Sequence, residues 1–184
     1  STADQRDFLD LLLVAIAEHG LTPTAVAARM TYDADPQSMQ SAIAAGILGC
    51  GPIVLGPSEL CGKLLAEGQA RVDAGEAVAD VTRAIATETR KAGGKMPGFG
   101  HPLHRPVDPR TQRILTLAAE RGVDGKFVAL ARAFEAAVAE AWGKPLPMNV
   151  SMPMAAVMLD LGFPAAMIKA IPLLARTGGL LAHL

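Results

Sequence analysis

One stretch of the 184-residue chain gathers side chains that can transfer protons and bind anions. Segment 93–110, GGKMPGFGHPLHRPVDPR, contains His101, His104, Arg105 and Arg110. Its four glycines and four prolines exclude a regular helix, so it forms a long irregular connection. Imidazole exchanges protons near neutral pH, and guanidinium pairs with carboxylates and phosphates. The stretch therefore predicts an anion-binding site with acid–base chemistry.

The rest of the chain predicts helices that position this segment. Apolar residues recur at helical spacing, as with Phe8, Leu12 and Ile16. Thr22–Pro23 and Asp35–Pro36 each place a capping oxygen before a proline, a pattern typical of a helix start. The same pattern recurs at Asp108–Pro109. No segment shows the alternation of a strand, so the sequence predicts an all-α fold.

Composition and charge exclude several function classes. The chain carries 17 basic and 18 acidic residues, without a charged tail, so nothing favours nucleic acid or an anionic membrane as partner. Cys50 and Cys61 form no metal-ligand pattern, which indicates free thiols and an intracellular, cytoplasmic protein. The apolar run from Phe8 to Ala17 is far shorter than the roughly 20 residues that span a bilayer. We expect no metal site and no membrane segment.

Segment 97–110 resembles the signature of the citrate synthase superfamily, nearest to its citryl-CoA lyase branch. His101 is followed at fixed spacing by Arg105 and by Asp108–Pro109–Arg110. Three further segments resemble the same family, AEHGLTP at 17–23, SAIAAG at 41–46 with Gly51–Pro52, and IPLLARTG at 171–178. The resemblance implies a citrate synthase-like all-α fold. It also implies a large-domain part at 1–55 and 148–184, with a small domain on the CoA side inserted at 56–147.

The resemblance implies roles for individual residues. His101 would be the main catalytic residue and would take the hydroxyl proton as a carbon–carbon bond breaks. His19 would bind the carbonyl or hydroxyl end of the substrate, although without the resemblance its position favours an ordinary histidine near a helix C-terminus. Arg110 and Arg176 would hold substrate carboxylates. The segment Pro97, Gly98, Phe99 and Gly100, with His104 and Arg105, would bind coenzyme A.

Two positions depart from the family pattern. Val54 stands where synthases have a histidine that binds the thioester enolate, and valine donates no hydrogen bond. The lyase module of ATP-citrate lyase also lacks that histidine. Ser151 stands where the family has the aspartate that moves the methyl proton, and serine does not titrate near neutrality. Ser151 is thus either a catalytic residue acting through water or the N-cap of a helix.

The resemblance implies an enzyme, a citryl-CoA lyase or citrate synthase-like acyltransferase. Its reaction would convert citryl-CoA to acetyl-CoA plus oxaloacetate, or the reverse, with coenzyme A as the acyl carrier and small di- or tricarboxylates as partners. Subunits of the family pair through the large domain, so we expect a homodimer. The alternative is a non-catalytic member that binds CoA or a dicarboxylate for regulation or assembly.

Overall fold

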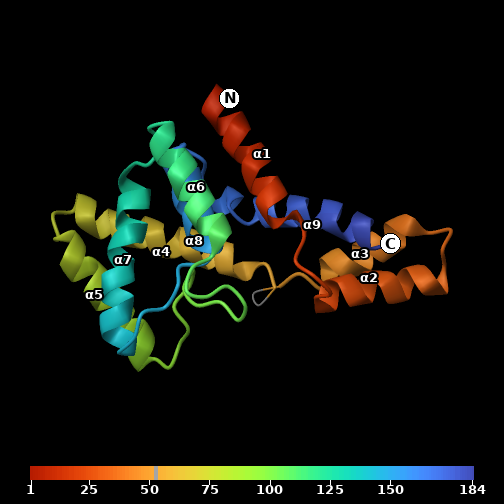
Figure 1. Cartoon of the computed structure of the whole chain (residues 1–184), viewed down its shortest axis with the longest axis horizontal. Coiled ribbons are helices and arrows are strands. Elements are labelled where there is room, and N and C mark those ends of the chain that lie inside the picture. The colour runs from red at the N-terminus through yellow and green to blue at the C-terminus, as the bar shows by residue number, and fades with distance from the viewer. Residues whose placement is uncertain (52–53) are drawn as a thin grey trace.

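The protein is built of α-helices, as the sequence predicts. The computed structural model describes residues 1–51 and 54–184 and contains, within them, nine α-helices, one short 3₁₀ helix and no strand (Figure 1). Pro52 of the Gly51–Pro52 motif lies outside the described residues. In chain order the helices are α1 (Ala3–Ala17), α2 (Pro23–Ala34), α3 (Met39–Leu48), α4 (Gly56–Asp73), α5 (Val78–Lys91), α6 (Pro109–Glu120), α7 (Lys126–Trp142), α8 (Ser151–Asp160), the 3₁₀ helix η1 (Ala165–Met167) and α9 (Ala170–His183).

Helix α8 is the centre of the larger core. Seven consecutive residues, Met152 to Met158, are buried, so the helix is apolar on every side. It packs against α4, α6 and α7, and α5 covers α7 from outside. Phe8, Phe134 and Ile114 join the same core from α1, α7 and α6. The start of α8 is therefore held rigidly, which matters for the site beside it.

A second, smaller group of helices lies at the other end of the molecule. Helices α2 and α3 pack on each other and on the end of α9, well away from α5 and α7 (Figure 1). Their contact is made by small residues, Ala25 and Ala28 together with Gly46 beneath Leu180. Helix α1 crosses α9 at Gly179, where a Cβ atom would overlap the carbonyl oxygen of Ala17. This crossing fixes the C-terminal end of α1.

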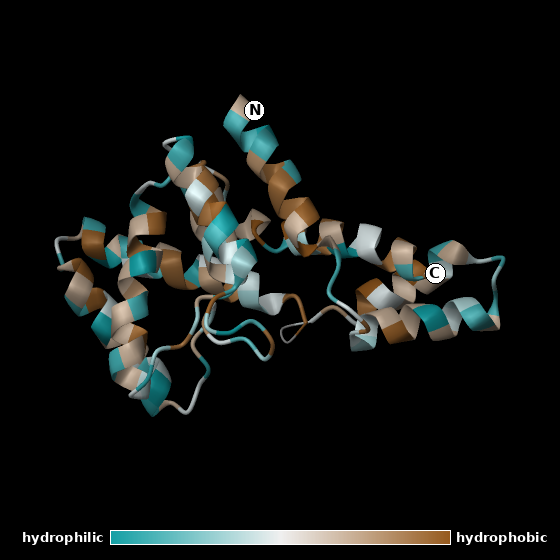
Figure 2. Ribbon diagram, viewed as in Figure 1, coloured by the Kyte–Doolittle hydropathy of each residue, from teal (hydrophilic) through white to brown (hydrophobic). Residues whose placement is uncertain are grey.

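The apolar surface of α1 follows its contacts. In Figure 2 its free N-terminal end is hydrophilic, whereas the part that approaches α9 is hydrophobic.

The structure bears on the expected domain boundary at 55/56 in two ways. Helix α4 begins at Gly56, next to that boundary. However, α8, from the expected 148–184 part, packs on helices of the expected 56–147 part. Where the division between domains falls stays a prediction.

Two helix starts are confirmed and one is wrong. Helix α2 begins at Pro23 and α6 at Pro109, as the proline patterns predict. Helix α3 begins instead at Met39, because the Asp35 carboxylate accepts a hydrogen bond from the Gln37 N–H and closes a local turn. Asp35 therefore stabilises the connection between α2 and α3.

The C-terminal stretch Ala165–His183 is long and apolar enough to cross a membrane by length and composition alone. In the structure it is the pair η1 and α9, and α9 packs against α1, α2 and α3. It also contains Arg176, which is buried within the protein. Packing in the core accounts for part of its apolar character, since 39% of the stretch is buried.

Candidate active site

The loop that carries His101 is tied to the start of α8. The Gly100 N–H donates to the Pro147 carbonyl (2.7 Å), and the Asn149 N–H donates to the Gly98 carbonyl (2.9 Å). The Asn149 side chain adds a bond from Nδ2 to the Gly100 carbonyl (2.9 Å). Gly98 has a φ of +77°, and a Cβ there would lie 2.7 Å from Cβ of Met152, so only glycine allows this approach.

A cavity of about 620 Å³ opens where six parts of the chain meet. They are the end of α1, the start of α4, the loop 100–104, the start of α6, the start of α8 and α9. Its walls include every residue for which the sequence implied catalysis or substrate binding, namely His19, His101, Arg110, Ser151 and Arg176, and also Val54. Residues more than 150 positions apart in the chain thus share one site.

The ring of His101 is held by two backbone donors. The N–H groups of Leu103 (3.1 Å) and His104 (2.9 Å) both donate to Nδ1, so Nδ1 carries a lone pair and the proton of the neutral ring sits on Nε2. Burial, followed by the neighbouring charge of His104, lowers the pKa of His101. His101 therefore presents a hydrogen-bond donor, which conflicts with its expected role as acceptor of the hydroxyl proton.

His19 offers the complementary group. It follows α1, and neither of its ring nitrogens is hydrogen bonded to a described residue. Partial burial, followed by the charges of Arg176 and Arg110, lowers the pKa of His19, which favours the neutral ring. A neutral ring without such bonds has one nitrogen free to accept a proton. The carboxylate of Glu18, which accepts bonds from the N–H groups of His19 and Gly20, fixes the backbone beneath it.

Arg176 is a buried cation that the described residues leave without a partner. Only 2% of the residue is exposed, and Nε and Nη1 are buried without a hydrogen bond to any described residue. A guanidinium cannot lose its proton in a protein, and a buried unpaired charge is strongly unfavourable. Because Arg176 lines the cavity, an anion bound there would supply the missing partner.

Arg110 is oriented by a fully buried carboxylate, Asp108. Nε and Nη2 of Arg110 donate to its two oxygens at 3.0 and 2.8 Å, and the backbone N–H groups of Arg110 and Val150 donate as well. Burial opposes ionisation of Asp108, but Arg110 outweighs it and lowers the pKa. The sequence identified Asp108 only as a helix cap. Its role in aiming Arg110 and joining α6 to α8 is a tertiary feature.

Ser151 is the first residue of α8, and its side chain does not cap the helix. The N-cap interpretation is therefore wrong, since the Ser151 N–H is instead bound by the side chain of Asn149 (3.1 Å).

Val54 and Ser151 both lie on the cavity wall. Among the described lining residues Glu18 is the sole carboxylate, and its pKa is lowered, first by the Gly20 N–H. The two departures thus leave the histidines as the groups suited to proton transfer.

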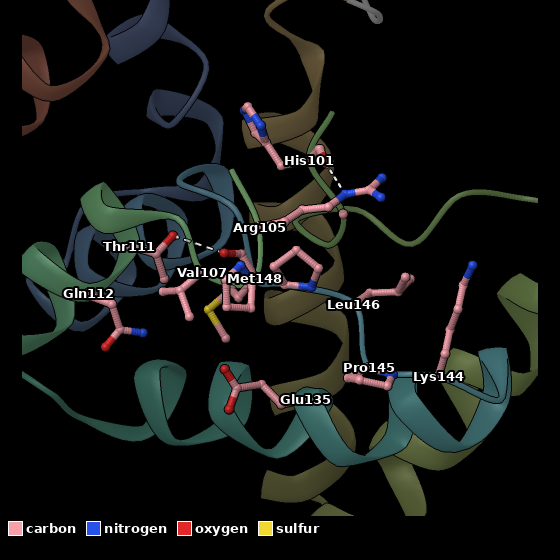
Figure 3. A pocket seen from close by; sticks show the side chains of 13 residues that line it. His101, Arg105, Val107, Thr111, Gln112, Glu135, Lys144, Pro145, Leu146 and Met148 are labelled. Carbon is pink, nitrogen blue, oxygen red and sulfur yellow. Dashed lines mark hydrogen bonds between the residues drawn. The ribbon is translucent and has the colours of Figure 1, made fainter. Parts of the chain in front are cut away.

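A second cavity, of about 720 Å³, adjoins the first across Gly100 and His101. Figure 3 shows His101 and Arg105 on one side and Glu135 of α7 on the other, with Lys144 following α7. Nε of Arg105 donates to the His101 carbonyl (3.2 Å). Of the residues implied for coenzyme A, Gly100 and Arg105 line this cavity and His104 lines the first. Pro97, Gly98 and Phe99 line neither, and Phe99 is buried in the core.

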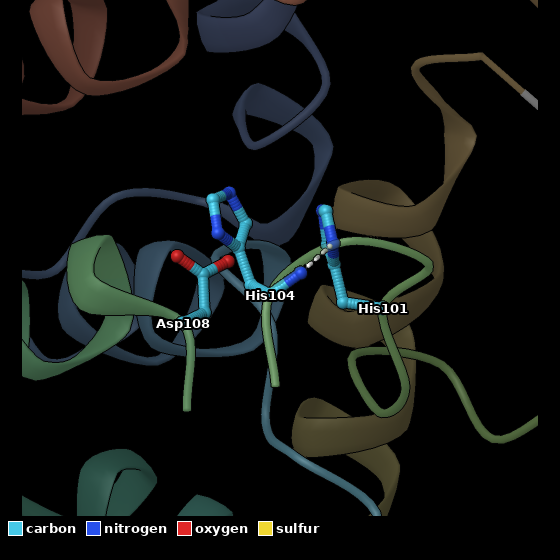
Figure 4. Close-up of side chains that lie close together, drawn as sticks. All are labelled: His101, His104 and Asp108. Carbon is cyan, nitrogen blue, oxygen red and sulfur yellow. Dashed lines mark hydrogen bonds between the residues drawn. The ribbon is translucent and has the colours of Figure 1, made fainter. Parts of the chain in front are cut away.

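His101, His104 and Asp108 bring potential metal ligands within 4.8 Å of one another (Figure 4). Two of the three residues are already engaged, because Nδ1 of His101 accepts two backbone bonds and both Asp108 oxygens bind Arg110. The arrangement orients side chains within the protein. That the site uses no metal stays a prediction.

The chain matches known proteins over its whole length. The family model described as "Citrate synthase, C-terminal domain" matches residues 1–184. "Putative citrate synthase 2" of Mycobacterium tuberculosis is 31% identical over 181 residues, which cover 96% of this chain and 46% of the relative. The chain thus spans about half the length of the curated relatives that it matches.

Solved structures give the same result. Citryl-CoA lyase from Hydrogenobacter thermophilus superposes with a TM-score of 0.87 at 28% identity, covering all of this chain and 69% of that one. A citrate synthase from Thermoplasma acidophilum, solved as a ternary complex with carboxymethyl coenzyme A and oxaloacetate, has a TM-score of 0.79 at 21% identity. It covers 100% of this chain and 48% of its own, and at that identity the likeness shows the fold alone.

Proposed function

The chain belongs to the citrate synthase family, and from this we propose that it is an enzyme that breaks or makes a carbon–carbon bond in a CoA thioester. The most direct reaction is cleavage of citryl-CoA to acetyl-CoA and oxaloacetate. The observation that carries the proposal is Arg176, a buried cation without a partner among the described residues, on the wall of a cavity that also holds His19 and His101, whose pKa values are lowered. That cavity suits a small carboxylate that reacts at a neighbouring oxygen.

In this proposal the two arginines bind and the two histidines divide the proton chemistry. Arg176 and Arg110 hold carboxylates of the citryl group. The free ring nitrogen of His19 takes the hydroxyl proton, and Nε2–H of His101 donates a hydrogen bond to the same oxygen as it becomes a ketone. The carbon–carbon bond breaks, and its electron pair moves onto the thioester, giving an enolate. Water then protonates the enolate carbon, since Ser151 does not titrate.

Coenzyme A is proposed to occupy the second cavity. Arg105 and Lys144 are cations on its wall that can meet phosphate oxygens. The cavity adjoins the first at Gly100 and His101, so a thioester could reach from one to the other. The placement leaves Pro97, Gly98 and Phe99 as scaffold that holds the loop.

The test is to incubate the protein with citryl-CoA, and separately with acetyl-CoA plus oxaloacetate, while measuring free thiol and keto acid. With the unsubstituted protein we expect the measured amounts of free thiol and keto acid to change. His101→Asn should reduce the rate by about a hundredfold or more, the typical loss when a fixed hydrogen-bond donor at a reacting oxygen is removed. Its CoA affinity should stay within about a few-fold, because Arg105 and Lys144, and not His101, are proposed to meet the phosphate oxygens of CoA.

The non-catalytic alternative is favoured by Val54 and Ser151, which place an alkyl group and a hydroxyl where the family pattern has acid–base residues. A parent that binds CoA and oxaloacetate but shows no cleavage, condensation or exchange of acetyl-CoA methyl protons would support that alternative. A His101→Asn variant as fast as the parent would instead overturn the mechanism alone.

A further inference from the structure

Helix α4 begins at the first cavity with a free donor. Its N-cap is Leu55, which has no side chain able to cap, and Leu55, Pro57 and Ser58 all line the cavity. In the first turn the N–H of Gly56 donates to the Gly51 carbonyl (3.0 Å), and Pro57 has no N–H. The N–H of Ser58 has no bond to a described residue outside the helix and lies too early in α4 for one within it.

The side chain of Ser58 adds a second donor at the same place. Only 4% of Ser58 is exposed, and its hydroxyl makes no hydrogen bond to a described residue. The hydroxyl is not enclosed in the core, since Ser58 lines the cavity, so its O–H can donate to a ligand atom there. The 18-residue helix behind it adds the positive end of its dipole.

We propose that Ser58, through its hydroxyl and its backbone N–H, binds the thioester oxygen on which negative charge develops. The inference rests on the proposed function. When the carbon–carbon bond of the citryl thioester breaks, its electron pair forms the enolate, and the thioester carbonyl oxygen becomes an oxyanion. Two fixed donors stabilise that oxyanion by hydrogen bonding, and no proton is transferred to it. In the family pattern a histidine binds this oxygen, and Val54 stands in its place, four residues before Ser58. The two donors of Ser58 would supply the hydrogen bonds that valine cannot.

Other hydroxyls on the cavity wall are less suited to this role. Thr22 is bound to the hydroxyl of Thr24 (2.9 Å), and the N–H of Ser151 is bound by Asn149. The start of α8 is thus occupied by a side chain of the protein, whereas the start of α4 is not. Among the described lining residues, Ser58 combines low exposure and a hydroxyl that makes no bond to a described residue with a free N–H.

The experiment compares two probes by calorimetry, CoA and carboxymethyl-CoA, whose carboxylate stands in for the enolate oxygen. Ser58→Ala should weaken carboxymethyl-CoA binding by about tenfold or more, as expected for a lost hydrogen bond to a charged group. Its affinity for CoA should be unchanged. Adding Val54→His to Ser58→Ala should restore part of the carboxymethyl-CoA affinity, because it returns a donor to the wall. Ser41→Ala, which removes an exposed hydroxyl on α3, is the matched control and should change neither affinity.

The possible results separate the two proposals. Equal losses for both probes, or no loss for either, would overturn the role of Ser58 while leaving the enzyme proposal intact. A parent that binds neither probe would overturn the proposed function and this inference with it. The oxyanion site would be established by a Ser58→Ala variant that has the melting temperature of the parent and a lower affinity for carboxymethyl-CoA but not for CoA.

Discussion

The two backbone hydrogen bonds to Nδ1 of His101 set how the site responds to pH. Protonating the ring would place an N–H against two other N–H groups, and burial and His104 already lower the pKa. The ordinary pKa of histidine is about 6.5, and we expect the ring of His101 to be still in its neutral Nε2–H form at that pH. Its contribution to the rate should be present above the lowered pKa and lost as pH falls through it. ¹⁵N NMR titration checks this, and a doubly protonated ring at pH 6.5 would contradict it.

Arg176 should lower stability in the absence of a ligand. Arg176→Met removes a buried unpaired charge and keeps most of the volume, so the free energy of unfolding should rise by about 0.5 to 2 kcal/mol. Oxaloacetate should raise the unfolding free energy of the parent but not of the variant. Urea denaturation with and without oxaloacetate measures both effects. Arg113→Met on the exposed face of α6 is the control, and oxaloacetate should still stabilise it.

Which single residues the sequence could predict depends on where their partners lie. His19, His101, Arg110, Ser151 and Arg176 belong to short local motifs, and the structure brings all of them to one cavity. The hydrogen bond from the Val150 N–H to the Asp108 carboxylate and the place of Ser58 on the cavity wall depend on how distant elements pack, which no local pattern encodes. The same limit explains Phe99, whose place in the glycine-rich loop suggests a ligand contact although the ring is in the core.

At the scale of helices, the crossing of α1 and α9 is the most sensitive contact near the site. Gly179→Ala would force a methyl group onto the Ala17 carbonyl, displacing the end of α1 that precedes His19. We expect a loss of about 1 to 3 kcal/mol in unfolding free energy, together with weaker oxaloacetate binding.

Gly178→Ala is the matched control, because a Cβ there meets open space in the same helix. It should stabilise the protein slightly, since alanine favours helix by up to about 1 kcal/mol. Equal effects of the two substitutions would mean that the crossing tolerates movement. Chemical denaturation followed by circular dichroism distinguishes the two cases.

Helix positions were predictable where one local signal acted without competition. Pro23 and Pro109 begin helices because a proline's missing N–H costs nothing in the first turn. At Asp35–Pro36 the same pattern occurs, but the aspartate satisfies the Gln37 N–H in a turn, and the helix begins three residues later. Pro172 obeys the same rule, because it lies in the first turn of α9.

At the scale of the whole molecule, the smaller helix group is proposed as the dimer surface. Met30 is 68% exposed and Leu48 86% exposed, on α2 and α3, and Leu181 of α9 is also exposed. Burying such side chains favours association. Sedimentation equilibrium at micromolar concentration should give a dimer, and Met30→Lys should shift it toward monomer. A parent that sediments as a monomer, or a variant that dimerises equally well, would contradict the proposal.

The buried charge of Arg176 also bears on how sequences of this kind evolve. Because most substitutions destabilise, selection for folding alone retains changes that add stability. Exchange of this arginine for a long apolar residue is such a change, and one that a lineage could accept as soon as no anion had to be bound. A descendant released from its ligand should therefore lose this arginine early, before the surface arginines. Continued selection for binding an anionic ligand would preserve the buried Arg176 of this chain.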